Sequence, residues 1–133
     1  MGKRMVHKIH RAKIKRELKA DEKTLITSLL SHLPNPNPYI EQLENLQVVG
    51  QCDCGCPTID LAMKEQKNIS SEVPEILIEA DGRSPEGIPV GIILWAKASY
   101  LSEMEVYPWE DTLKFGLPEP KTLTNYGNRE TDI

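Results

Sequence analysis

The sequence predicts an α+β fold, with N-terminal helices packed on one face of an antiparallel β-meander of four to five strands. Two observations support this prediction. Apolar residues recur with helical spacing over residues 21–46 and with a period of two over residues 47–107. Proline and glycine clusters separate the later runs, as expected for sequential hairpins. We divide the chain into a basic N-terminal arm (1–20), an α+β domain (21–110) and an irregular C-terminal tail (111–133).

The first expected elements are helices. The arm has a sparse apolar stripe among many like charges, which predicts only a weak helix. A stronger helix begins at Asp21, where acidic residues suit the positive end of the helix dipole, and it ends before Pro34. The apolar face of this helix consists of Leu25, Ile26, Leu29, Leu30 and Leu33, and His32 lies off that face.

A second, short helix should follow, because Asn37 and Pro38 form a good N-cap and first-turn pair. Its apolar face consists of Ile40, Leu43 and Leu46, whereas Glu41, Gln42, Glu44 and Asn45 should point outward. The two helices would form a hairpin on the sheet.

Five segments with alternating patterns predict the strands: 48–52, 58–63, 75–81, 88–98 and 101–107. In the fourth segment, Ile93 and Trp95 lie opposite the main apolar row, so both of its faces should be at least partly covered. In the fifth, Glu103 and Glu105 alternate with apolar residues, which predicts one face exposed to water.

Composition and charge narrow the class of protein. Of 133 residues, 39% are hydrophobic and 27% are charged, which is ordinary for a globular domain. No apolar run approaches the roughly 20 residues that cross a bilayer, and no signal-peptide core follows the basic start. Three cysteines within five residues do not resemble a secreted disulfide framework. We therefore expect a cytoplasmic protein with no membrane segment.

The net charge of −4 is unevenly distributed. Residues 1–20 carry eight Lys and Arg against one acid, Glu17, whereas the rest of the chain carries eight bases and 19 acids. The arm has no aromatic residue to stack bases and the body is acidic, so nucleic-acid binding is not expected. We interpret the arm as a solvated surface element, and His7 and His10 within it as solvated rather than metal-binding.

The most distinctive stretch is Cys52-Asp53-Cys54-Gly55-Cys56-Pro57-Thr58-Ile59-Asp60-Leu61, preceded by Val48-Val49-Gly50. Further blocks are Gly87-Ile88-Pro89-Val90-Gly91-Ile92-Ile93-Leu94, Leu101-Ser102-Glu103-Met104-Glu105 and 117–123. Together these blocks resemble a group of small, uncharacterised bacterial proteins. The chain departs from that group where Ala98-Ser99-Tyr100 replaces a glycine turn, and in its basic arm. The resemblance supports the fold prediction and implies no established activity.

The cysteines Cys52, Cys54 and Cys56 could bind a soft metal ion, zinc or copper(I). The first two point the same way along a strand, and Gly55 could turn the third toward them. A closed zinc site would need a fourth ligand from elsewhere. The more ordinary interpretation is buried structural thiols beside a tight hairpin turn. For a disulfide, Cys54 and Cys56 are the better pair, because the turn between them shortens the distance.

Catalytic candidates are few, and we predict that the chain is not an enzyme. His32 is the only histidine outside the arm. Asp60 and Asp81 could form a carboxylate pair, but no spacing joins them, and the simpler interpretation of Asp60 is a hydrogen bond to a neighbouring turn. The glycines match neither nucleotide-binding fingerprint.

Protein binding is the remaining class. Acidic small domains, such as inhibitors and immunity proteins of nucleases, can neutralise a basic partner. We therefore predict a non-catalytic, cytoplasmic protein-binding domain of inhibitor or immunity type, and the alternative is a thiol-based metal-binding protein. The predicted binding residues are Tyr107, Trp109, Glu103 and Glu105. A simpler role for the two aromatic rings is to cover the sheet edge.

Overall fold

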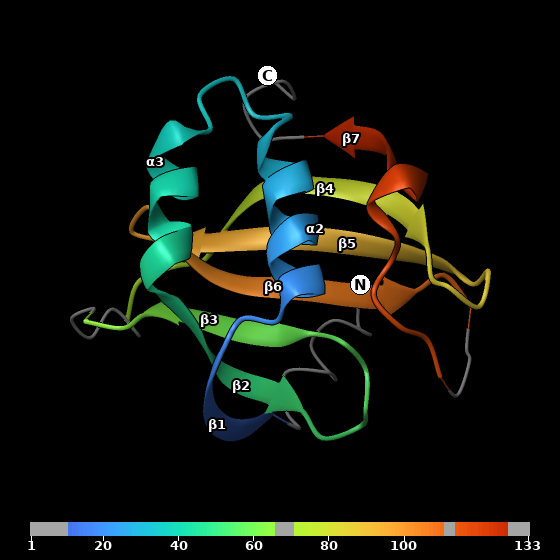
Figure 1. Cartoon of the computed structure of the whole chain (residues 1–133), viewed down its shortest axis with the longest axis horizontal. Coiled ribbons are helices and arrows are strands. Elements are labelled where there is room, and N and C mark those ends of the chain that lie inside the picture. Colours follow the sequence, from blue (N-terminus) through green and yellow to red (C-terminus); the bar gives the residue numbers. More distant parts are fainter. Residues whose placement is uncertain (1–10, 66–70, 111–113, 128–133) are drawn as a thin grey trace.

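A computed structural model describes residues 11–65, 71–110 and 114–127. Within these residues one antiparallel sheet of seven strands dominates (Figure 1). In chain order the strands are β1 (Arg11–Glu17), β2 (Leu46–Cys52), β3 (Ile59–Met63), β4 (Glu75–Arg83), β5 (Pro89–Lys97), β6 (Tyr100–Pro108) and β7 (Thr124–Gly127). Their order across the sheet is β1-β2-β3-β6-β5-β4-β7.

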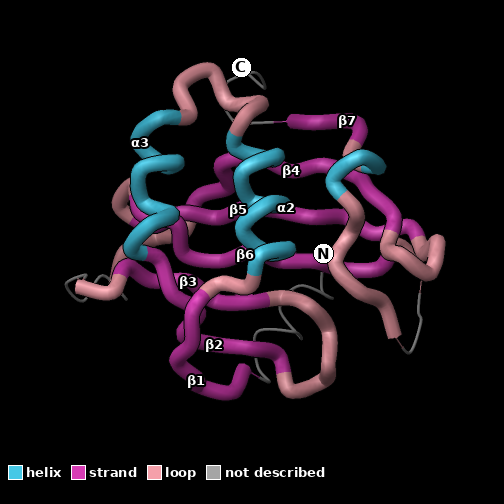
Figure 2. The backbone as a smooth tube through the Cα atoms, in the orientation of Figure 1, coloured by secondary structure: helices cyan, strands magenta, loops and turns pink. Residues whose placement is uncertain are grey.

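The helices are short and lie on one side of the sheet (Figure 2). They are α2 (Ala20–Leu30), α3 (Asn37–Ile40), and the 3₁₀ turns η1 (Glu41–Asn45) and η2 (Pro120–Thr122). The start of α2 is capped by Glu22, whose Oε1 accepts the Lys19 backbone N–H at 2.8 Å. No helix of the described ranges is long and apolar enough to cross a membrane.

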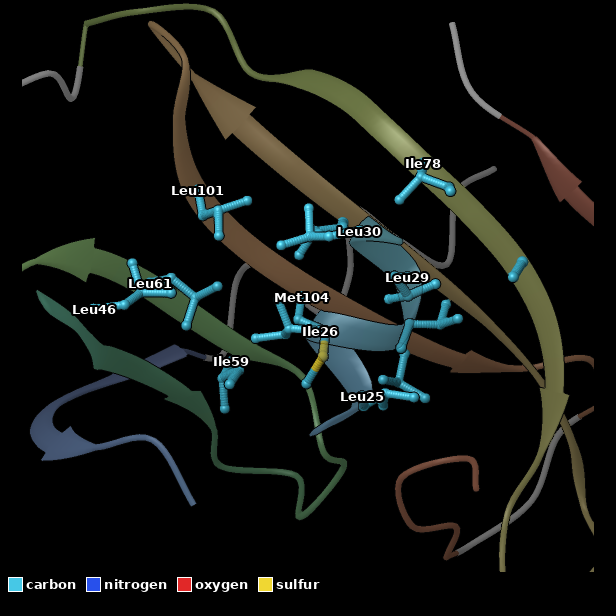
Figure 3. Close-up of a cluster of buried hydrophobic side chains, with 14 of the residues drawn as sticks. Leu25, Ile26, Leu29, Leu30, Leu46, Ile59, Leu61, Ile78, Leu101 and Met104 are labelled. Atoms are coloured by element: carbon cyan, nitrogen blue, oxygen red, sulfur yellow. The ribbon is translucent and has the colours of Figure 1, made fainter. Parts of the chain in front are cut away.

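The main core lies between α2 and the sheet (Figure 3). The apolar stripe of α2 contributes Leu25, Ile26, Leu29 and Leu30, all nearly inaccessible to water. Strand residues such as Ile59, Ile78 and Met104 are buried in the same cluster. Because α2 is only three turns long, this burial provides most of its stability.

The predicted fold class is wrong. In place of an α+β domain with a four- to five-stranded meander, the described residues form a mainly β fold with two short α-helices and a seven-stranded sheet. The strand order is not sequential, because β3 pairs with β6 and β7 pairs with β4. The two edge strands, β1 and β7, come from the segments that we assigned to the arm and the tail.

The weak helix expected in the arm is also wrong for the residues that are described, because Arg11–Glu17 is a strand. Its register with β2 pairs Arg11 with Cys52 and Glu17 with Gln47. Exposed lysines on β1 suit an edge strand, since edge charges discourage pairing with another chain. The five alternating segments are strands, as predicted, with ends shifted by at most two residues.

One polar residue of the second helical segment does not point outward. Gln42 is buried beneath the turn that joins β5 to β6. That turn places two non-glycine residues, Ala98 and Ser99, at positive φ values of 48° and 68°. The Gln42 side chain donates to the Ser99 carbonyl oxygen at 2.8 Å and accepts the Leu101 N–H at 2.9 Å. It therefore satisfies backbone groups at the hairpin.

Candidate metal centre and the adjoining charge cluster

The three cysteines lie in the connection between β2 and β3. Strand β2 ends at Cys52, and the chain turns at once, because the Gly55 N–H donates to the Cys52 carbonyl oxygen at 3.3 Å. Gly55 has a φ of 92°, a conformation that favours glycine. This turn begins at Cys52, and it brings the following cysteines back toward the strand end.

The sulfur atoms form a compact group. The three Sγ atoms lie within 4.8 Å of one another, and no other group of three or more possible metal ligands occurs in the described ranges. Cys52 and Cys56 are buried, whereas Cys54 is exposed. Burial of the first two fits the expectation of structural thiols, but exposure of Cys54 does not.

Two of the cysteines are paired as a disulfide, Cys52 with Cys54, and Cys56 is not part of a disulfide. We expected Cys54 and Cys56 to be the better pair, and the structure corrects this. The turn begins at Cys52, and the Cα atoms of Cys52 and Cys54 are 5.3 Å apart, within the range of ordinary disulfides. The Cys56 backbone N–H donates to the Cys54 sulfur at 3.4 Å.

This spacing also suits a bound ion. Thiolates at the usual zinc–sulfur distance of ~2.3 Å lie about 3.8–4.0 Å from one another around a tetrahedral or trigonal ion. The observed limit of 4.8 Å is close to this spacing, and binding of an ion would first require reduction of the bond between the Cys52 and Cys54 sulfurs. Hydrogen bonds from the backbone to sulfur commonly support thiolate ligands, and the Cys56 N–H is placed to do so.

A charge cluster crosses the sheet beside the cysteines. Asp60 on β3 and Glu103 on β6 are cross-strand partners, and they face away from the helix-covered core because their neighbours Ile59 and Met104 face into it. Arg11 on β1 donates one guanidinium nitrogen to Asp60 and another to Glu103, the latter at 2.9 Å. Burial lowers the pKa of Arg11, but the two carboxylates outweigh it and raise that pKa above its usual range.

The thiol group and the charge cluster are adjacent. Arg11 is the cross-strand partner of Cys52, and Gly50, two residues earlier on β2, is the partner of Asp60. Sequence reasoning missed Arg11 because it is separated from Asp60 by 49 residues and from Glu103 by 92. The pattern holds no local signal for this contact.

The residues predicted to bind a protein partner lie in different environments. Glu103 is 7% exposed and Glu105 is fully buried, so the predicted wet face of β6 is wrong. Glu105 accepts the Trp95 indole N–H at 3.0 Å. Tyr107 is half-buried with its ring against Gly91, and Trp109 is 55% exposed.

The carboxylate pair considered for catalysis does not form. Asp60 pairs with Arg11 rather than with a turn, and Asp81 on β4 accepts a hydrogen bond from Asn125 at 2.8 Å. Strands β6 and β5 separate the two aspartates in the sheet. His32 is exposed and stacks on Tyr126, with ring centroids 3.6 Å apart. His7 and His10 lie outside the described residues.

Comparison with known proteins adds no family. No protein-family model, curated protein or solved structure matches the chain. The resemblance to a group of small bacterial proteins therefore stays a prediction.

Proposed function

We propose that the protein binds a soft metal ion, Zn²⁺ or Cu⁺, through the thiolates of Cys52, Cys54 and Cys56. The observation that carries the proposal is the convergence of the three sulfur atoms to within 4.8 Å. Cu⁺ accepts three thiolates as a complete trigonal set, whereas Zn²⁺ would take a fourth ligand such as water. Zinc in such a site would keep one exchangeable position.

The burial pattern supports this proposal over purely structural thiols. Cys52 and Cys56 are buried, and Cys54 at the surface gives an ion a route to the site. Cys54 is not packed in the interior, as a free structural thiol usually is, and in the structure it is bonded to Cys52.

The binding of a basic protein partner, which the sequence favoured, has less support. It requires Glu103 and Glu105 at the surface, and both are buried. Of the four residues predicted for that role, Trp109 alone is largely exposed. Protein binding stays a prediction, without a specific contact surface to support it.

The test is metal titration of the reduced full-length chain against a competing chelator, with Zn²⁺ and Cu⁺ in separate arms. We expect one equivalent of at least one ion to bind, and Co²⁺ in place of zinc to show thiolate-to-metal charge-transfer absorption. Cys54→Ser should weaken affinity more than about 100-fold, beyond the 10- to 100-fold typical of a lost supporting partner.

Asp53→Asn is the matched control, because Asp53 is exposed between two of the ligands and is not part of the converging group. Its affinity should stay within about threefold of the unaltered protein, as expected for an exposed charge screened by salt. If the reduced protein takes up neither ion, or if both variants lose affinity equally, the three-thiolate proposal is wrong.

A further inference from the structure

We propose that the Cys52–Cys54 disulfide is the oxidised form of the metal site, so that thiol oxidation releases the ion and reduction restores binding. This inference rests on the proposed function and adds its regulation. The same two sulfur atoms serve both states: they are bonded to each other in the structure, and they are two of the three converging ligands.

The two states exclude each other for a chemical reason. A metal ligand must be a thiolate, and a sulfur atom in a disulfide has no such charge to donate. Oxidation therefore removes two of the three ligands, and Cys56 is then the one remaining thiol of the group. One thiolate holds zinc or copper(I) far more weakly than three, so loss of the ion should be nearly complete.

The exposure of each cysteine indicates which sulfur atom reacts first. The exposed Cys54 is the accessible nucleophile, whereas Cys52 is only 2% exposed and Cys56 is 8% exposed. The Cα separation of 5.3 Å lets Cys52 reach Cys54 without movement of the strand. Cys56 is then required for metal binding but not for the disulfide.

The oxidation is a thiol–disulfide exchange with a small-molecule disulfide, such as oxidised glutathione. The Cys54 thiolate attacks one sulfur of that disulfide, which forms a mixed disulfide and expels one small thiolate. The Cys52 thiolate then attacks the Cys54 sulfur, which closes the protein disulfide and expels the second small thiolate. The protein loses two electrons, the small disulfide gains them, and the two expelled thiolates take protons from the solvent as the ion leaves.

The experiment uses the full-length chain loaded with one equivalent of Zn²⁺. Stepwise addition of oxidised glutathione is followed by release of zinc to a chromogenic chelator and by mass spectrometry of proteolytic fragments. We expect the amount of zinc released to follow the amount of disulfide formed between Cys52 and Cys54. Zinc binding should return after reduction. The oxidised protein should bind zinc at least about 100-fold more weakly than the reduced protein, by the same reasoning as for loss of a ligand.

Two variants separate the steps. Cys56→Ser should weaken zinc binding in the reduced protein yet form the Cys52–Cys54 disulfide at an unchanged rate. Cys54→Ser should form no disulfide within the chain that involves position 52. Because Cys54 is exposed, Cys54→Ser should fold normally, and circular dichroism provides the check.

Separate outcomes identify which proposal fails. If the reduced protein binds no metal, the proposed function fails and the redox control fails with it. If the reduced protein binds zinc but oxidation leaves the affinity within about threefold, redox control is wrong and the metal site stands. If the disulfide maps to Cys56, the Cys52–Cys54 bond is not the oxidised form of the site and the proposal is wrong as stated.

Discussion

Gly50 on β2 lies directly against the Asp60 carboxylate on β3, in the space that a side chain at position 50 would occupy. Because Gly50 has no side chain, a residue of the edge strand can contact residues on the far side of β2. Arg11 on β1 reaches past β2 to Asp60 on β3 and to Glu103 on β6, so one guanidinium joins three strands. Glycine in a strand interior usually weakens the strand, and here it marks a close approach of charged groups.

Gly50→Ala should destabilise the fold by about 1–3 kcal/mol, because the added methyl group overlaps Asp60 and pushes it from Arg11. Urea unfolding followed by circular dichroism gives the free energy of unfolding. Gly116→Ala is the matched control, since a methyl group there meets no atom closer than 3.7 Å. We expect that control to change stability by less than about 0.5 kcal/mol. Equal stability of the two variants would contradict the close approach.

Arg11→Met should lower the free energy of unfolding by about 3–5 kcal/mol, because it leaves two carboxylates without their shared cation. The lower end is expected, since the Asp60 side chain is 32% exposed and keeps some contact with water. Lys15→Met, an exposed position on the same strand, should have little effect. Adding Asp60→Asn and Glu103→Gln to Arg11→Met should recover part of the loss, and a further loss of stability would argue against the ion-pair account.

The alternating pattern predicted β2 to β6 because each of these strands has a row of apolar residues on the core face. It could not predict β1, whose sequence of Lys and Arg around Ile14 fits an edge strand and a weak helix equally well. What decides the conformation is pairing with β2, a contact between segments separated by the helices. Pairing of β3 with β6 depends on long-range contacts in the same way.

The candidate site was predictable only in part. The three cysteines are neighbours in sequence, so their clustering needs no fold. Glu103 and Glu105 alternate with apolar residues, a pattern that equally suits a wet face and a buried polar row. What distinguishes the two is a cation for Glu103 and an indole N–H for Glu105, and those partners come from other strands. Buried charge follows from the fold and not from the local pattern.

Gln42→Ala should lower the free energy of unfolding by about 1–3 kcal/mol, because the Leu101 N–H would lose its partner in a buried position. Glu44→Ala, an exposed change in the same 3₁₀ turn, is the control and should have a small effect. If the two variants unfold at the same urea concentration, Gln42 does not support the hairpin.

Replacement of Ser99 by glycine should stabilise the same hairpin. Ser99 has a φ of 68°, a conformation that costs an ordinary residue about 1–2 kcal/mol. Ser99→Gly removes that cost but adds entropy to the unfolded chain, so we expect a net gain of up to about 1 kcal/mol. The Ser99 carbonyl oxygen, which Gln42 binds, is retained in this variant. Thermal unfolding is the measurement, and a lower melting temperature would contradict the predicted relief.

Stability should also depend on the ionisation of Glu22 at the start of α2. Burial raises the pKa of this carboxyl, but hydrogen bonds from Arg16 and from the Lys19 backbone N–H outweigh burial and hold the pKa below its ordinary value of 4.5. Arg16 binds both carboxylate oxygens, at 2.9 and 2.8 Å. Because the folded-state pKa is below the unfolded value, ionised Glu22 contributes stability that is fully present above about pH 4.5 and is lost as the pH falls through the folded-state pKa.

Glu22→Gln should therefore lower the free energy of unfolding at neutral pH by about 1–3 kcal/mol and make its decline in acid shallower. Arg16→Met removes the cation that lowers the pKa of Glu22, so this pKa should rise and Glu22 should contribute less to the loss of stability in acid. Urea unfolding from about pH 7 to about pH 3 measures both effects. Glu44→Gln, at an exposed site, is the control for carboxylate removal. Parallel pH profiles for Glu22→Gln and the unaltered protein would show that Glu22 is not responsible for the acid limb.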